Sequence, residues 1–126
     1  MLDNVLTHSE STYTGIDIWV QDVARTSLGH HVDKVTILEG DSQVILQGMS
    51  QKFDIIYIDG DHSAQGVLFD SVLAWRLAKR YMLWDDYRSA AYQVDTGLRS
   101  FFNCIPRDKY MVIIDNYQYG VQLVNS

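Results

Sequence analysis

The stretch from Phe53 to His62 reads FDIIYIDGDH, and it decides the fold class of this chain. Its first six residues are almost continuously apolar, which is typical of a central strand buried on both faces of a parallel sheet. The run ends abruptly in Asp59, Asp61 and His62. Because ligands of open α/β sheets bind beyond the carboxyl ends of the strands, we expect a binding site at this end.

Further apolar runs lie on both sides of this stretch, and segments with helical spacing separate most of them. This alternation of strand and helix predicts an α/β sheet covered by helices. The last two runs are joined by a few residues around Asp115 and Asn116, too few for a helix crossover, which predicts an antiparallel hairpin at one edge. We expect strands at 13–18, 34–38, 53–58, 81–84, 110–114 and 119–124, and helices at 19–28, 42–49, 64–79 and 87–104.

The helix expected at 64–79 has the clearest periodicity. Its apolar side chains fall close to one stripe, which should pack on the sheet, while Asp70 and Ser71 fall elsewhere. The tryptophan Trp84 is expected in the core or at an interface. The predicted stripe consists of Val67, Leu68, Val72, Trp75 and Leu77.

Composition narrows the class of protein. With 126 residues, 47% of them hydrophobic, the chain is expected to form one domain over residues 1–126. Its 10 basic and 16 acidic residues give a net charge of −6, which argues against a nucleic-acid partner. The single Cys104 excludes a disulfide framework, which favours a reducing, cytoplasmic location. No apolar run approaches the roughly 18 residues of a membrane span, so we expect no membrane partner.

Taken in order, five stretches resemble the class I S-adenosylmethionine-dependent methyltransferases: GIDIW, KVTILEGDS, FDIIYIDGDH, YMLWDDY and the terminal YMVIIDNYQYGVQLV. The nearest similarity is to small-molecule O-methyltransferases, a group that includes the metal-dependent catechol-type enzymes. The resemblance runs from about Tyr13 to the C-terminus. It implies a Rossmann-like methyltransferase fold, with a mostly parallel sheet and a C-terminal antiparallel hairpin, and a small-molecule substrate.

The resemblance also implies a cofactor site. Asp17 corresponds to the acidic residue that hydrogen-bonds the ribose hydroxyls of S-adenosylmethionine, and Asp41 and Ser42 correspond to the turn beside its adenine. From the residues alone, Asp41 and Ser42 are also good helix N-caps, because their side-chain oxygens accept backbone N–H bonds.

A metal site is implied at the other strand ends. Asp59, Asp85 and Asp86 correspond to the ligands of Mg²⁺ in metal-dependent relatives, and His62 falls near the residue that deprotonates the substrate hydroxyl. Carboxylates that follow parallel strands should meet at one edge, and hard oxygen ligands suit Mg²⁺ or Ca²⁺. The alternative is local: these acids close turns, and Asp61 and His62 begin the helix that follows Ser63.

One family feature is absent from the sequence. The first strand of these methyltransferases and its glycine-rich turn have no counterpart, because no two of the eight glycines are separated by a single residue. We therefore expect a fold truncated at its N-terminus. Loss of a central strand would leave apolar edges unpaired, which favours direct pairing of GIDI with FDIIYI, or a homo-oligomer.

Three functions remain open at this point. The first is metal-assisted O-methyl transfer. The second is a non-enzymatic Rossmann-like module that acts through oligomerisation or protein binding. The third interprets DGD as the aspartate pair of a nucleotide-sugar glycosyltransferase. A phosphoacceptor receiver domain is excluded, since its acidic pair should follow the first strand.

Overall fold

The computed structural model describes residues 13–17 and 35–124. The chain divides into two compact units, Met1–Ile45 and Leu46–Ser126, and each is described by itself. The helix expected at 19–28 lies outside the described residues. The single domain over residues 1–126 stays a prediction.

The first unit contains two parallel strands, β1 (Tyr13–Asp17) and β2 (Val35–Glu39), which pair from Tyr13 with Val35 to Asp17 with Glu39. Gly40 follows β2 with φ 153°, a conformation that favours glycine. This turn leads directly into α3 (Ser42–Gly48).

The second unit contains four strands in the order β3-β4-β6-β5: β3 (Phe53–Ile58), β4 (Ala78–Trp84), β5 (Tyr110–Asp115) and β6 (Tyr119–Leu123). The β5–β6 pair is antiparallel at one edge, which confirms the predicted hairpin. Only β3 and β4 are parallel within this sheet, because β6 also runs antiparallel to β4. The sheet of the second unit is therefore mixed rather than mostly parallel.

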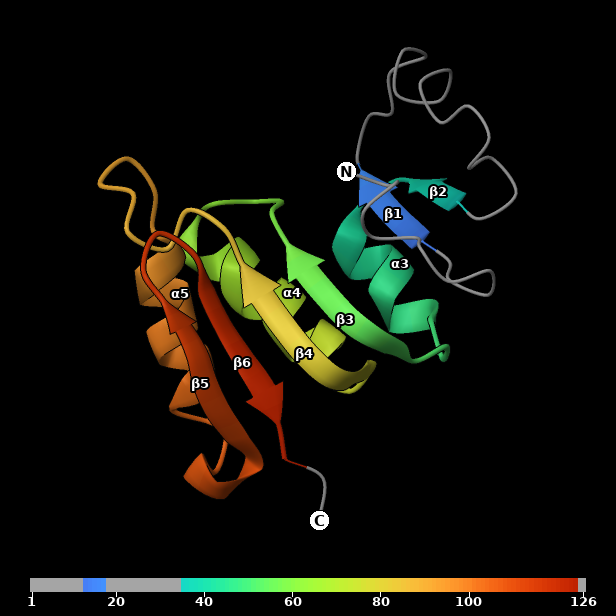
Figure 1. Cartoon of the computed structure of the whole chain (residues 1–126). Helices are drawn as coiled ribbons and strands as arrows, with labels where there is room; N and C mark the ends of the chain where they lie inside the picture. The colour runs from blue at the N-terminus through green and yellow to red at the C-terminus, as the bar shows by residue number, and fades with distance from the viewer. Residues whose placement is uncertain (1–12, 18–34, 125–126) are drawn as a thin grey trace. The chain divides into compact units, whose positions relative to one another are not determined.

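Two helices, α4 (Ala64–Trp75) and α5 (Val94–Phe102), lie side by side on one face of this sheet (Figure 1). A short 3₁₀ helix, η2 (Arg107–Lys109), precedes β5. Both α4 and α5 are shorter than expected: α4 ends at Trp75 because β4 already begins at Ala78, and residues 87–93 form turns. No described helix has the length and apolar character needed to span a membrane.

The prediction that β3 is buried on both faces is wrong for the described structure. β3 lies at the edge of its sheet, and Ile55 and Tyr57 are 56% and 49% exposed. Ile58 and the partly buried Ile56 belong to the core instead, so β3 alternates between a helix-covered face and an open face.

The stripe predicted for α4 is also partly wrong. Val67 is buried as expected, but Val72 is exposed, whereas Asp70 and Ser71 are buried. Ser71 is tolerated there because its hydroxyl donates to the carbonyl of Val67 (2.6 Å) and accepts the indole N–H of Trp84 (2.9 Å). A buried indole N–H requires such a partner, so α4 turns a serine towards the sheet.

The core lies between the helices and the sheet. Trp84 is fully buried at the carboxyl end of β4 and packs near Phe101 and Phe102 of α5. The buried cluster consists of Ile58, Val67, Ala74, Met82, Trp84, Val94, Leu98, Phe101, Tyr110 and Val121.

Candidate functional site

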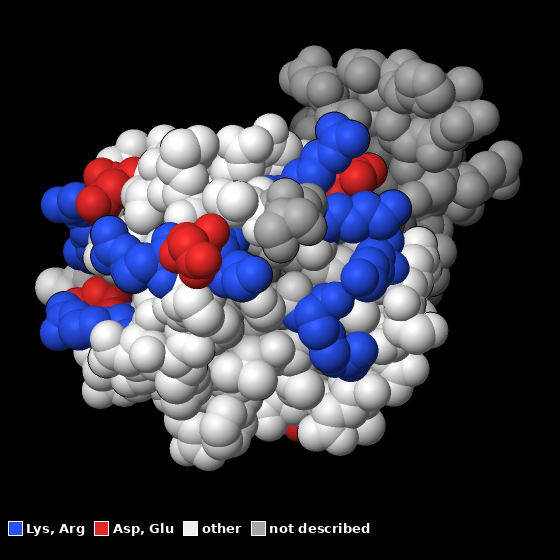
Figure 2. All heavy atoms as spheres, turned by 90° about the horizontal axis from the view of Figure 1, so that it is seen from below, with Lys and Arg blue, Asp and Glu red and all other residues white. Residues whose placement is uncertain are grey.

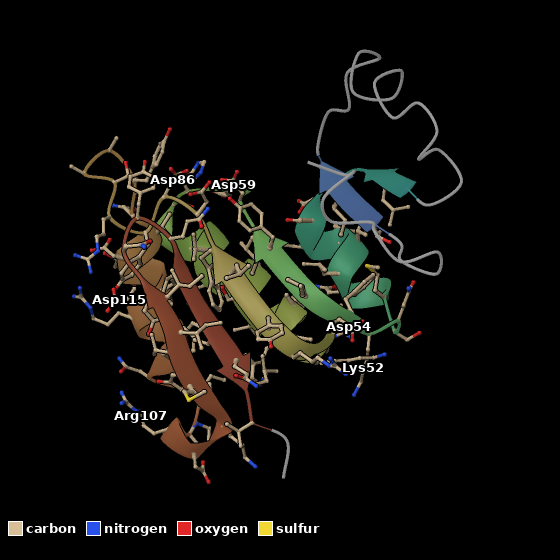
Figure 3. All side chains as sticks on the ribbon, in the orientation of Figure 1. Lys52, Asp54, Asp59, Asp86, Arg107 and Asp115 are labelled. Carbon is tan, nitrogen blue, oxygen red and sulfur yellow. The ribbon has the colours of Figure 1, made fainter. Side chains whose placement is uncertain are left out.

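The two parallel strands β3 and β4 end level with one another. Ile58 pairs with Trp84 at the last register position, and the N–H of Asp85 donates to the carbonyl of Ile58 (3.2 Å). The residues that follow each strand therefore emerge at the same edge of the sheet, where Figure 3 shows Asp59 and Asp86 together.

Three of these residues bring their side chains into direct contact. His62 Nε2 lies 2.9 Å from Asp86 Oδ2 and 3.3 Å from Asp59 Oδ1. One donor atom from each of Asp59, His62 and Asp86 lies within 4.8 Å of the others, a spacing that could hold a metal ion. We call these three residues the rim cluster.

A left-handed backbone conformation positions Asp86. Its φ is 59°, which aspartate adopts more readily than most residues, at a cost on the order of 1 kcal/mol. Asp85 Oδ1 accepts the N–H of Asp86 (2.8 Å), which stabilises the turn. The chain therefore turns directly after β4 and directs the Asp86 carboxylate towards His62.

Two contacts fix the position of His62, one through its ring and one through its backbone. Its ring stacks on that of Tyr92, with centroids 4.1 Å apart and planes 14° from parallel. The backbone carbonyl of His62 accepts the N–H of Gln93 (3.0 Å), the residue immediately before α5. The loop after β3 is thus fastened to the start of α5, which orients Nε2 towards the two carboxylates.

Asp85 faces a different partner, Tyr57 of β3. The Tyr57 hydroxyl donates to Asp85 Oδ2 at 2.6 Å. This bond, followed by that from the N–H of Asp86, holds the pKa of Asp85 below its usual value. Partial burial and then the Asp85 carboxylate raise the pKa of Tyr57, so the phenol remains a donor at neutral pH.

The β5–β6 turn contributes a second tyrosine. The carbonyl of Tyr117 accepts the N–H of Tyr87 (2.8 Å), which brings this turn to the rim. A hydrogen bond to Asp86 is the main cause that raises the pKa of the exposed Tyr117 phenol. Asp86 is therefore approached by an imidazole and by a phenol.

Asp61 bonds to the start of α4 and is not one of the three residues of the rim cluster. Its Oδ1 accepts the N–H of Ser63 (2.8 Å), and the hydrogen bonds from Ser63 lower the pKa of the Asp61 carboxyl. Ser63 caps α4 by accepting the N–H of Gly66 (3.1 Å). A Cβ at Gly66 would overlap Asp61, so this glycine makes room for the turn.

The three residues predicted to bind the cofactor lie in the first unit. Asp17 ends β1 opposite Glu39, which places it near the start of the turn after β2. Asp41 Oδ1 accepts the N–H of Gln43 (2.9 Å), and Ser42 is the first residue of α3. Asp41 thus acts as a helix cap. These residues belong to the first unit, whereas the rim cluster belongs to the second.

Sequence reasoning missed the aromatic residues of the site, Tyr57, Tyr92 and Tyr117. Only Tyr57 carried a usable signal: it precedes Asp59 by two residues in a strand, so both should project from the same face. Tyr92 and Tyr117 come from loops distant in sequence, and no local pattern marks them.

Comparison with known proteins identifies the family of the domain. Residues 1–87 match the family model of a methyltransferase domain. No curated protein matches this chain.

Several solved structures share the fold. A "putative O-methyltransferase from Klebsiella pneumoniae" superimposes with a TM-score of 0.68 at 19% identity, over 94% of this chain and 64% of that protein. The O-methyltransferase from Bacillus cereus in complex with SAH gives 0.67 at 17% identity, over 90% and 63%. The O-methyltransferase TomG from Streptomyces achromogenes in complex with SAM gives 0.67 at 14% identity, over 94% and 64%. This chain therefore spans less than two thirds of the length of these proteins, and at such identities the likeness concerns the fold alone.

Proposed function

Because the chain belongs to the methyltransferase domain family, we propose that it contributes to metal-assisted O-methyl transfer from S-adenosylmethionine to a small hydroxylated molecule. The observation that carries this proposal is the rim cluster, in which Asp59, His62 and Asp86 converge after two parallel strands. Such convergence at the carboxyl ends of strands is where α/β proteins bind their ligands.

The donor set of the rim fits a divalent cation. Asp59 and Asp86 offer carboxylate oxygens, which suit Mg²⁺, Ca²⁺ or Mn²⁺, and Asp85 lies directly beside them. In this proposal Asp59 and Asp86 hold the ion, while both oxygens of Asp85 already accept hydrogen bonds that shape the turn. A bound divalent ion would lower the pKa of a substrate hydroxyl and fix its position.

His62 then takes the proton of that hydroxyl on Nε2, the atom that faces both carboxylates. Imidazole is the side chain that serves most often as a general base in proteins, and the stack on Tyr92 holds the His62 ring in place. S-adenosylmethionine would supply the methyl group: a C–O bond to the substrate would form as the C–S bond breaks, leaving a methyl ether and S-adenosylhomocysteine. Alignment of oxygen and methyl group supplies most of the acceleration.

The cofactor half of the proposal rests on Asp17, Asp41 and Ser42. The resemblance in sequence suggests that Asp17 bonds the ribose and that the turn at Asp41 and Ser42 lies by the adenine. Two of the structurally similar O-methyltransferases are complexes with SAH or SAM, which supports this choice of cofactor.

Calorimetric titration with Mn²⁺ and with Mg²⁺ tests the metal site. We expect Asp86→Asn to weaken binding at least about tenfold, the effect typical of altered metal ligation. Asp54→Asn is the matched control, because it removes the same charge from an exposed residue at the other end of β3. Equal affinity in the two variants would contradict a metal site at the rim.

A second titration separates the two roles that His62 Nε2 could fill. As a proton acceptor, His62→Gln should keep the affinity for Mn²⁺ within about threefold and abolish methyl transfer to catechols, followed by mass spectrometry. A loss of Mn²⁺ affinity equal to that of Asp86→Asn would instead make His62 a ligand.

The cofactor site is tested by titration with S-adenosylhomocysteine. We expect micromolar binding that Asp17→Ala weakens at least tenfold, since the carboxylate that would accept hydrogen bonds from the ribose hydroxyls is removed. No heat at millimolar ligand would leave the chain without the cofactor and would contradict methyl transfer.

The homo-oligomer and the cytoplasmic location expected from the sequence stay proposals. Sedimentation of the full chain should give a mass larger than 14.5 kDa if a second copy pairs with an open strand edge. A clean monomer would contradict that expectation.

A further inference from the structure

A second group of charged side chains lies at the opposite end of β3 and β4. A hollow of about 410 Å³, open to solvent, is lined by Lys52, Asp54, Ala78, Lys79 and Arg80. Figure 3 shows Lys52 and Asp54 at the end of the sheet farthest from Asp59 and Asp86. We call this feature the amino-end hollow.

An irregularity in strand pairing brings two cations to the same hollow. Phe53 pairs with Ala78, but Ile55 pairs with Tyr81, so β4 contains one residue more than β3 over this interval. In a regular strand the consecutive Lys79 and Arg80 would project to opposite faces. The extra residue changes their direction, as β-bulges do, and both side chains line the hollow.

The lining is strongly biased towards positive charge. It carries three cationic side chains and the single carboxylate of Asp54. Arg80 Nε lies 4.0 Å from Asp54 Oδ1, with these side chains 71% and 70% exposed, so this ion pair is weak. The positive charge of this grouping is opposite in sign to the net charge of −6 of the whole chain. Seen from below, blue Lys and Arg side chains dominate this part of the surface (Figure 2).

Grouped cations of both kinds are suited to phosphate. An arginine guanidinium can donate two parallel hydrogen bonds to one phosphoryl group, and lysine ammonium groups neutralise neighbouring oxygens as point charges. A volume of about 410 Å³ lies within the range of small-molecule sites. A diphosphate group, with several negative charges in a small volume, matches this lining better than a single carboxylate does.

We propose that the amino-end hollow is a second binding site, which takes a small ligand bearing a diphosphate group through Lys52, Lys79 and Arg80. The site is distinct from the rim cluster. Lys52 precedes the six residues of β3 and Asp59 follows them, so at about 3.3 Å per residue the two lie roughly 20 Å apart. A ligand in the hollow would therefore lie far from the rim cluster.

Titration of the full chain with inorganic pyrophosphate, followed by calorimetry at constant ionic strength, tests the proposal. EDTA is present throughout, so that a cation at Asp59 and Asp86 cannot recruit the probe. We expect Arg80→Gln to weaken binding at least tenfold. Arg99→Gln is the matched control and should change it less than twofold, since Arg99 is equally exposed (75%) and has a similar weak acidic partner in Asp95 (3.9 Å).

A second variant guards against a folding artefact. Lys52 precedes β3 and lies outside its strand pairing, so Lys52→Gln should leave the circular dichroism spectrum unchanged and still weaken pyrophosphate binding at least fivefold. Absence of binding at millimolar pyrophosphate would overturn the proposal. Equal weakening in Arg80→Gln and Arg99→Gln would also overturn it, because the effect would then follow net charge alone.

Discussion

The two ends of the β3–β4 pair carry charged side chains of opposite sign, and these side chains are fixed by contacts to very different degrees. At the carboxyl end, His62 contacts both Asp59 and Asp86, and Asp85 accepts a hydrogen bond from Tyr57. At the amino end, Arg80 lies 4.0 Å from Asp54, and both side chains are largely exposed. The same two strands thus hold a preorganised site at one end and a loosely arranged one at the other.

The difference follows from the side chains themselves. Short aspartates at strand ends accept hydrogen bonds from nearby backbone N–H groups, from a phenol and from an imidazole, so their positions are fixed by several partners. Long lysine and arginine side chains remain solvated and lose rotamer freedom when they bind. The carboxyl end should therefore be sensitive to single substitutions in its support, and the amino end should be tolerant.

The largest loss of stability is expected when Trp84, the buried residue that anchors the carboxyl end, is replaced. Trp84→Ala removes a fully buried ring directly before Asp85 and leaves the hydroxyl of Ser71 without its indole partner. We expect a loss of about 3–5 kcal/mol in the free energy of unfolding, measured in urea, together with loss of Mn²⁺ binding. The half-buried Leu83→Ala should cost distinctly less; equal losses would contradict the role of Trp84 as the anchor.

Substitutions of Asp86 should have a smaller effect on stability, and they separate the stability of the rim turn from its metal binding. Asp86 has a φ of 59°, so Asp86→Gly should be more stable than Asp86→Ala by about 1 kcal/mol, because glycine adopts this conformation without strain. Both variants remove the carboxylate and should bind Mn²⁺ equally weakly. Equal denaturation midpoints for the two would show that the turn relaxes when Asp86 is replaced.

The Tyr57–Asp85 bond should make stability at the carboxyl end depend on pH. The pKa of Asp85 is lowered in the folded state. The Asp85 carboxylate therefore contributes stability at pH values above its unfolded pKa of about 3.9, and this contribution is lost as the pH falls through the folded pKa. Tyr57→Phe should therefore be less stable than the wild type by roughly 0.5–1 kcal/mol at pH 6, and the gap should shrink below pH 4. A gap that stays constant from pH 6 to pH 3 would exclude this linkage.

The smallest effect belongs to the amino end. Asp54→Asn breaks the Arg80–Asp54 pair, and we expect the free energy of unfolding to change by less than about 0.5 kcal/mol, since both side chains are largely exposed. Added salt should reduce even this difference. A loss above 1 kcal/mol in urea denaturation would show that the amino end is as ordered as the rim.

Local patterns predicted several elements well. The run FDIIYI was expected as a strand at 53–58, which are the observed bounds of β3, because hydrophobic runs and turn residues act within one segment. The terminal hairpin followed from the short connection around Asn116. The packed face of α4 was predicted less well, because the place of Ser71 depends on Trp84 in another element.

By itself, the sequence determined that acidic residues and a histidine follow apolar strands, since both the strand run and its polar end are encoded locally. It also pointed to the methyltransferase family, which the match over residues 1–87 bears out. Only the tertiary structure decided which of these residues meet: His62 reaches Asp86, Asp85 turns to Tyr57, and Lys79 shares a hollow with Arg80. Such contacts depend on the register and packing of segments that are distant in the chain, and that information is held by no single stretch of it.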